Sequence, residues 1–160
     1  MTCIVAVVTP QGAWIGADSL SSSDEGLASI SATPKVSKFG DLLVGFAGNW
    51  RQGQRVFEVL SRTIDPTIET IIKSFKPEGE ELELLVVQDR RIFEVQADLG
   101  IIESKKVKGF AYGAVGSGAA TALGALYLDH EDEGSIGRAL EATEEHNTKV
   151  RKPFIIIGAQ

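Results

Sequence analysis

The stretch that decides the fold is Thr2–Asp18, which reads TCIVAVVTPQGAWIGAD. Residues 2–9 are rich in valine and isoleucine, whose branched side chains favour extended strands. Pro10-Gln11-Gly12 has the composition of a turn, and residues 13–18 resume the apolar pattern. We therefore predict that the chain opens with a β-hairpin whose strands are residues 2–9 and 13–18.

The residue directly behind Met1 is a threonine, Thr2. Aminopeptidases commonly remove a methionine that precedes threonine, and the chain would then begin with a residue that carries both a hydroxyl group and a free α-amine. A threonine hydroxyl is a poor nucleophile unless a base takes its proton, and the α-amine of the same residue can be that base. Thr2 is therefore a candidate nucleophile, although threonine is common at this position in proteins of every kind.

Length and composition are those of a globular protein. The 160 residues fit one domain, residues 1–160, and 43% of them are hydrophobic and 24% charged. The net charge is −6 with a pI near 5.0, and no basic cluster is longer than pairs such as Lys105-Lys106 and Arg151-Lys152. Because nucleic-acid-binding proteins usually carry a basic patch, we predict binding neither to nucleic acid nor to an anionic membrane surface.

Cysteine and histidine usage argues against disulfides and metals. Cys3 is the one cysteine of the chain, His130 and His146 are isolated, and no Cys/His spacing fits a zinc site. We expect no metal and no cofactor. No apolar run reaches the ~18 residues of a membrane span, and the turn at Pro10 comes too early for a signal peptide, so we predict a cytoplasmic protein.

Further along the chain, strands and helices alternate in blocks. Residues 19–31 are small and polar, and we predict a loop there. Hydrophobic periodicity predicts helices in pairs, at residues 50–64 and 66–75 and at residues 119–128 and 135–150. Extended apolar runs predict strands at residues 36–39, 42–47, 82–88, 92–97, 109–115 and 153–158. Strand blocks that alternate with pairs of helices indicate two sheets between two helical layers.

Five short segments, spread over most of the chain, stand out together. They are Thr2-Cys3-Ile4-Val5, Ile15-Gly16-Ala17-Asp18, Pro34-Lys35-Val36, Gly45-Phe46-Ala47-Gly48 and Gly116-Ser117-Gly118. In their order and near-family spacing they resemble proteasome β subunits and, more closely, HslV, the bacterial two-ring protease subunit. The resemblance implies an α+β fold, the four-layer αββα sandwich of two antiparallel sheets found in N-terminal nucleophile hydrolases.

The resemblance also implies roles for the residues that activate Thr2. Lys35 matches the family's lysine, and Asp18 matches the aspartate that pairs with it and holds it charged. An α-amine has an ordinary pKa of about 7.7–8.0, and a nearby ammonium disfavours its charged form. Each residue also has an ordinary structural interpretation, since an aspartate after a strand is usually a turn or cap residue and a lysine after proline is usually solvated.

Three further positions match the family's supporting groups. The backbone N–H of Gly48 matches the donor that stabilises the oxyanion, and Ser117 matches a hydrogen-bond partner of the terminal amine. Glu145 falls near the place of an aspartate that also holds this amine, but a glutamate is one methylene longer. The neighbouring His146 is interpreted as a surface group, and Cys3, on the opposite strand face from Thr2, as a small buried hydrophobe.

Two interpretations of function remain open. In the first, the chain is a threonine peptidase that cleaves polypeptide inside a homo-oligomeric ring. Leu20 and Ser21, in the serine-rich segment Leu20–Ser23, would then line a cleft with Gly48 in which an extended peptide adds as a strand, and an ATPase unfoldase is a possible partner. In the second, Met1 is retained and the chain is a non-catalytic, ring-forming structural subunit.

A third class, an amide hydrolase of the same superfold with another substrate, is also compatible with the fold. Such enzymes often use an N-terminal cysteine or serine. Thr2, rather than Cys3, follows Met1 in this chain, which argues against that class.

Overall fold

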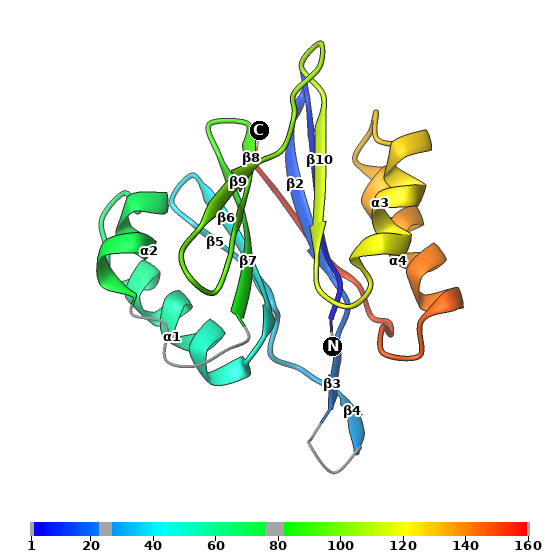
Figure 1. Ribbon diagram of the computed structural model, residues 1–160, viewed down its shortest axis with the longest axis horizontal. Helices are drawn as coiled ribbons and strands as arrows, with labels where there is room; N and C mark the ends of the chain where they lie inside the picture. The colour runs from blue at the N-terminus through cyan, green and yellow to red at the C-terminus, as the bar shows by residue number, and fades with distance from the viewer. Residues whose placement is uncertain (1, 23–26, 76–81, 160) are drawn as a thin grey trace.

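The computed structural model describes residues 2–22, 27–75 and 82–159. Two antiparallel sheets pack face to face, and a pair of helices covers the outer side of each (Figure 1). The predicted four-layer αββα sandwich is thereby confirmed. Within the described residues, no helix combines the length and the apolar character needed to cross a bilayer.

One sheet has four strands in the order β10–β1–β2–β11. The bounds are Ile4–Thr9 for β1, Gly12–Ala17 for β2, Ala111–Val115 for β10 and Ile155–Ala159 for β11. Ile4 pairs with Ala17 on one side and with Val115 on the other, while Ile155 also pairs with Ala17. The start of β1 and the ends of β2 and β10 therefore meet at one end of this sheet.

The other sheet has five strands in the order β5–β6–β7–β8–β9. The bounds are Val36–Phe39 for β5, Leu42–Gly48 for β6, Leu82–Gln88 for β7, Arg91–Val95 for β8 and Ile101–Glu103 for β9. Val36 pairs with Gly45 and Gly48 pairs with Leu82. Gly45 lets the sheets approach closely, because a Cβ there would lie only 2.5 Å from Ile4 Cγ2 of the first sheet.

Four helices form the outer layers. Helices α1 (Trp50–Ser61) and α2 (Ile68–Ser74) pack on the five-stranded sheet, and α3 (Ala119–Leu128) and α4 (Gly134–His146) pack on the four-stranded sheet. Helix α1 begins at Trp50 because the side chain of the preceding Asn49 accepts a hydrogen bond from Gln52 N at 3.0 Å, which caps its first turn.

The structure adds elements that the sequence patterns did not predict. Within residues 19–31, predicted to be a loop, strands β3 (Leu20–Ser22) and β4 (Ala28–Ile30) form an antiparallel hairpin that projects from the sandwich (Figure 1). Strand β9 was also not predicted. The first and last helices end earlier than predicted, at Ser61 and His146, since their apolar spacing continues into turns.

Candidate active site

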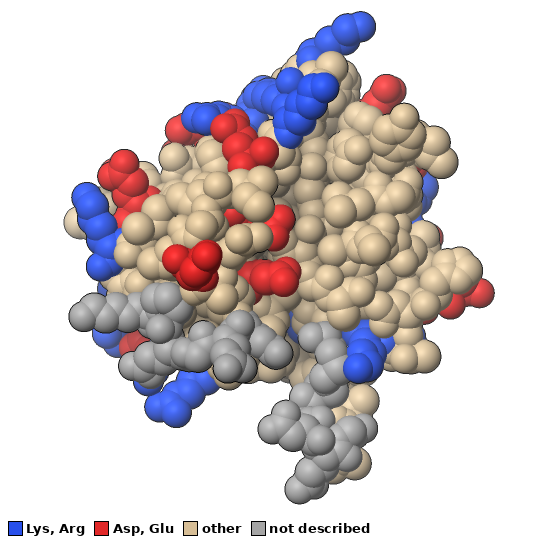
Figure 2. Space-filling view, in the orientation of Figure 1, with Lys and Arg blue, Asp and Glu red and all other residues tan. Residues whose placement is uncertain are grey.

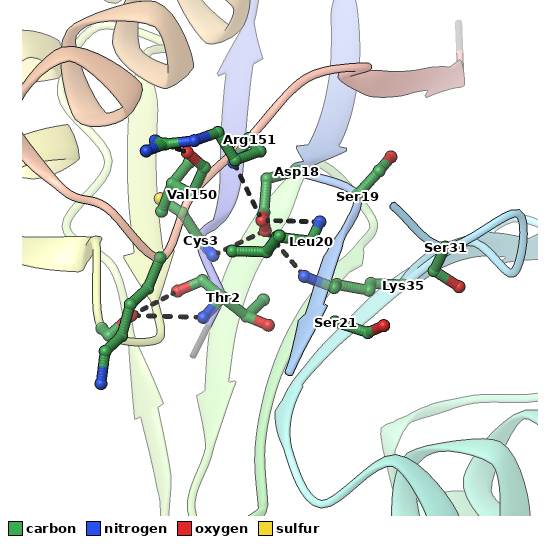
Figure 3. Close-up of polar contacts among 12 residues, drawn as sticks. Thr2, Cys3, Asp18, Ser19, Leu20, Ser21, Ser31, Lys35, Val150 and Arg151 are labelled. Atoms are coloured by element: carbon green, nitrogen blue, oxygen red, sulfur yellow. Dashed lines mark hydrogen bonds and ion pairs between the residues drawn. The ribbon is translucent and has the colours of Figure 1, made fainter. Parts of the chain in front are cut away.

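A buried ion pair lies where the two sheets meet. Lys35 Nζ donates to Asp18 Oδ1 at 2.9 Å, and each side chain is at most 1% exposed. The same Oδ1 accepts from Cys3 N at 3.1 Å, while Oδ2 accepts from Leu20 N at 3.1 Å and from Arg151 N at 3.4 Å. A buried carboxylate needs such partners, and these contacts fix Asp18 against the backbone that follows Thr2 (Figure 3).

The sequence explains how the ion pair forms. Asp18 directly follows β2 and Lys35 directly precedes β5, so each belongs to a different sheet and the pair joins them. Burial lowers the pKa of the Lys35 ammonium, and the neighbouring Asp18 carboxylate partly opposes that shift. Lys35 Nζ also lies 5.9 Å from the centroid of the Trp50 ring, within the range of a cation–π contact.

Thr2 is held next to this pair by the turn that follows β10. Its side chain and backbone are buried, its N donates to Ser117 Oγ at 3.2 Å, and its carbonyl accepts from Gly118 N at 3.3 Å. In Figure 3 the Thr2 side chain extends toward the side of the site on which Lys35 and Ser21 lie. Met1 lies outside the described residues, so the removal of Met1 stays a prediction.

Two glycines shape the backbone around Thr2. Gly116 has φ +99°, a conformation that residues with a Cβ rarely adopt, and a Cβ there would collide with the Thr2 carbonyl. The same Cβ would lie 3.4 Å from Ala47 Cβ, which brings the end of β6 to Thr2. Gly48, the last residue of β6, has φ +100° and is exposed directly before the cap residue of α1.

The segment that follows the C-terminal end of α4 contacts Ser117, which follows the C-terminal end of β10. Glu145 is not part of this contact. Glu145 is exposed, and no hydrogen bond to Thr2 or Ser117 is recorded for it among the described residues. Asn147 Nδ2 instead donates to the Ser117 carbonyl at 3.3 Å. The role of Glu145 as an amine-holding group stays a prediction, whereas Asn147 is a site residue that the sequence reasoning missed.

An open cavity of about 610 Å³ is bounded on one side by Trp50, the ring that Lys35 Nζ approaches. It is lined by hydroxyl-bearing and amide side chains, by this aromatic ring and by two aliphatic residues, from Ser21, Leu27, Ala28, Ser29, Ser31, Thr33, Trp50 and Gln54. Ser21 lines this cavity, and its Oγ is 3.0 Å from Ser29 Oγ; its role in a substrate cleft stays a prediction. Leu20 is buried and contributes its backbone to Asp18. Ser23 lies outside the described residues.

Cys3 does not present a second nucleophile. The side chain is fully buried in the cluster that packs α3 and α4 on the sheet. Burial raises the pKa of the Cys3 thiol to about 12, with a further contribution from the Asp18 charge. The thiol is therefore protonated near neutral pH. His146 is exposed at the end of α4, as the sequence analysis predicted.

Charged side chains are distributed unevenly over the face of the molecule that Figure 2 draws. Figure 2 shows acidic side chains near the middle of this face and lysine and arginine side chains mainly around its rim.

Arg151 is a further residue that sequence reasoning missed. It contacts the site through its backbone N and O, and a backbone contact leaves no signal in the residue type.

Comparison with known proteins identifies the fold. No protein-family model and no curated protein sequence matches the chain. A structure of BPH from Thiobacillus denitrificans in complex with epoxomicin is 19% identical, with a TM-score of 0.78 and 98% of each chain covered. A second structure of that BPH is 19% identical with a TM-score of 0.77, covering 98% of this chain and 97% of that one. Eukaryotic HslV from Trypanosoma brucei is 17% identical, with a TM-score of 0.76 and 98% of each chain covered. The chain therefore has the HslV-like fold over nearly its whole length.

Proposed function

We propose that this chain is a threonine-type peptidase whose nucleophile is Thr2 Oγ1, exposed by removal of Met1. The observation that carries the proposal is the buried Lys35–Asp18 pair. Asp18 Oδ1 also accepts from the N–H of Cys3, the residue directly after Thr2, and the Thr2 nitrogen in turn donates to Ser117 Oγ. A fully buried ion pair costs desolvation energy and is weak evidence for stability alone. Such a pair beside a candidate nucleophile instead favours a functional role.

The proposed reaction uses few groups. The Thr2 α-amine takes the proton from Oγ1, which attacks the scissile carbonyl carbon. The Lys35 charge disfavours protonation of the amine and so keeps the base available. The Gly48 N–H donates to the developing oxyanion. The amine then returns its proton to the leaving amino group, and water hydrolyses the acyl-enzyme to regenerate Thr2.

The substrate that we propose is an extended polypeptide. A peptide can add as a strand beside residues 20–22 and place one side chain in the cavity next to Trp50. The described residues that line the cavity carry no charge, so we expect uncharged side chains there. We further propose that the chain forms a homo-oligomeric ring that shields the site, with an ATPase unfoldase as a possible partner.

A second candidate function is a non-catalytic ring subunit that retains Met1. The observation that favours it is the exposure of Glu145, the position at which the family resemblance implied an acidic group that holds the terminal amine. In this case the nitrogen of Thr2 is an amide, which cannot act as a base.

The experiment that separates the two functions compares hydrolysis of unstructured fluorogenic peptides by the parent, Thr2→Ala and Thr2→Ser. The peptidase predicts turnover by the parent, residual turnover by Thr2→Ser, and none by Thr2→Ala. Parent-level turnover by Thr2→Ala would remove Thr2 as the nucleophile. No turnover by the parent, together with retained Met1, would establish the structural subunit.

A further inference from the structure

Glu83 approaches the same site from the opposite sheet. Its Oε2 accepts a hydrogen bond from Gly116 N at 3.1 Å. Glu83 belongs to β7 of the five-stranded sheet, whereas Gly116 follows β10 of the four-stranded sheet. The contact therefore links the two sheets at Gly116, which lies directly beside the Thr2 carbonyl.

The register of β7 explains why this carboxylate points toward the site. Side chains alternate between the faces of a strand. Leu82 and Leu84 pack under α1 and α2, while Leu85 and Val87 pack between the sheets. Glu83 shares the inner face with Leu85 and pairs in register with Ala47, which is the β6 residue that lies beside Gly116.

The turn at residues 116–118 has a glycine-rich backbone that hydrogen bonds from several segments hold. Two of its three residues are glycines, which lose more conformational freedom on folding than other residues. Its other recorded hydrogen bonds run to Thr2, to Asn147 and within the following helix. Among the described residues, Glu83 supplies the recorded bond from this turn to the five-stranded sheet.

We propose that Glu83 is a positioning residue for Thr2. Its carboxylate holds Gly116 in place, and Gly116 in turn keeps Ser117 Oγ within hydrogen-bond distance of Thr2 N. This inference rests on the proposed function for its catalytic consequence, but the Glu83–Gly116 contact can be tested without activity. Glu83 itself does not touch the reacting atoms.

The test uses Glu83→Ala, Glu83→Gln and Glu83→Asp, with Glu103→Ala as the matched control. Glu103 is a carboxylate of the same sheet that binds Arg91 at 2.6 Å on the surface, so its loss removes a comparable contact away from Thr2. The amide hydrogen exchange rates of residues 111–119 measure how firmly the turn at residues 116–118 is held. The rate of covalent reaction with the epoxyketone epoxomicin measures the reactivity of Thr2. Its dependence on epoxomicin concentration gives the maximal reaction rate and the binding constant separately.

For Glu83→Ala, we expect faster exchange at residues 116–118 and a maximal reaction rate lower by about 5- to 10-fold, as loss of one solvent-exposed hydrogen bond of ordinary strength predicts. The epoxomicin binding constant should change little. Glu83→Gln keeps an acceptor and should lie near the parent, while Glu83→Asp falls short of Gly116 and should resemble Glu83→Ala. Glu103→Ala should match the parent in both readouts.

Parent-like exchange and reaction in both Glu83→Ala and Glu83→Asp would overturn the proposal. A loss confined to the binding constant would also overturn it, because positioning acts on the reacting state. If the parent itself does not react with epoxomicin, the proposed function fails, and hydrogen exchange alone then decides whether Glu83 holds the turn. Should Glu83→Ala fail to fold, Glu83→Asp and Glu83→Gln carry the comparison.

Discussion

At the residue scale, the site depends on a lysine that is buried with its counter-ion. Lys35 is 1% exposed, and Asp18 both bonds its ammonium and accepts from three backbone N–H groups. The arrangement fixes the position of the ammonium relative to Thr2 through hydrogen bonds from several segments. The residue types of this pair were available from the sequence, because the family resemblance pointed to both positions.

Asp18→Asn is expected to destabilise the protein and to abolish the peptidase activity that we propose. The substitution leaves the Lys35 ammonium buried without a counter-charge, which costs about 3–5 kcal/mol in comparable cases. Denaturant unfolding measures this free energy. Asp41→Asn, in an exposed turn between β5 and β6, is the control and should cost little. An unfolding midpoint for Asp18→Asn equal to that of the control would contradict the role assigned to the ion pair.

Cys3 is expected to be unreactive in the folded protein. Folding raises the pKa of its thiol from 9.0 to about 12, so alkylation at pH 8 should label Cys3 only after denaturation. A raised thiol pKa contributes stability that is complete below pH 9 and is lost as the pH rises toward 12. The free energy of unfolding of the parent should therefore fall more steeply above pH 9 than that of Cys3→Ala. Rapid labelling of native protein would refute the buried position.

At the element scale, the strands and helices with strong hydrophobic patterns were predictable and the short polar ones were not. Residues 2–18 carry a clear hairpin pattern, and β1 and β2 form there. The β3–β4 hairpin is built from serine-rich sequence, and β9 has only three residues, all exposed. Each of these strands has three residues, which is shorter than the run of about four to eight residues over which alternating apolar and polar residues indicate a strand.

The site contacts that escaped prediction have the same origin. Asn147 and Glu83 reach the 116–118 turn from a helix end and from a strand of the other sheet. The spacing along the chain does not reveal where α4 stops or which face of β7 a residue occupies. Both depend on how the elements pack in the folded chain. Thr2, Asp18 and Lys35 could be found because they lie in short segments that resemble segments of a known family.

Two glycine-to-alanine substitutions should have opposite effects. Gly116→Ala forces a Cβ into the Thr2 carbonyl at φ +99°, and such backbone strain costs about 1–3 kcal/mol. Gly124 lies in α3, and a Cβ there meets no atom within 4 Å, so Gly124→Ala should stabilise by roughly 0.5–1 kcal/mol. Thermal unfolding of the two variants and the parent measures whether each substitution raises or lowers the stability. Stabilisation by Gly116→Ala would contradict the described turn.

At the scale of the whole molecule, the sandwich is complete within one chain, but its surface retains apolar side chains. Tyr127 and Leu128 of α3 are 72% and 84% exposed, and scattered exposed apolar residues are common in proteins. A ring that shields the site, and a single domain spanning residues 1–160, both stay predictions. The alternation of strand blocks and helix pairs did predict the layers, because layer order follows from burial patterns along the sequence.

Assembly into a ring is expected to be visible in solution. A chain of 17.1 kDa that forms a homo-oligomer should elute and scatter light as a multiple of that mass. Light scattering coupled to size exclusion, at several protein concentrations, measures it. A particle of one chain at every concentration would exclude the self-assembled ring and leave the site open to solvent.

The measurement that tests the central claim most directly is the intact mass of natively expressed protein before and after incubation with epoxomicin. An epoxyketone needs both the hydroxyl and the free amine of an N-terminal threonine to form its stable adduct. The account predicts a mass lacking Met1, one adduct per chain located at Thr2, and no adduct on Thr2→Ala. A chain that keeps Met1 and remains unmodified would contradict the account.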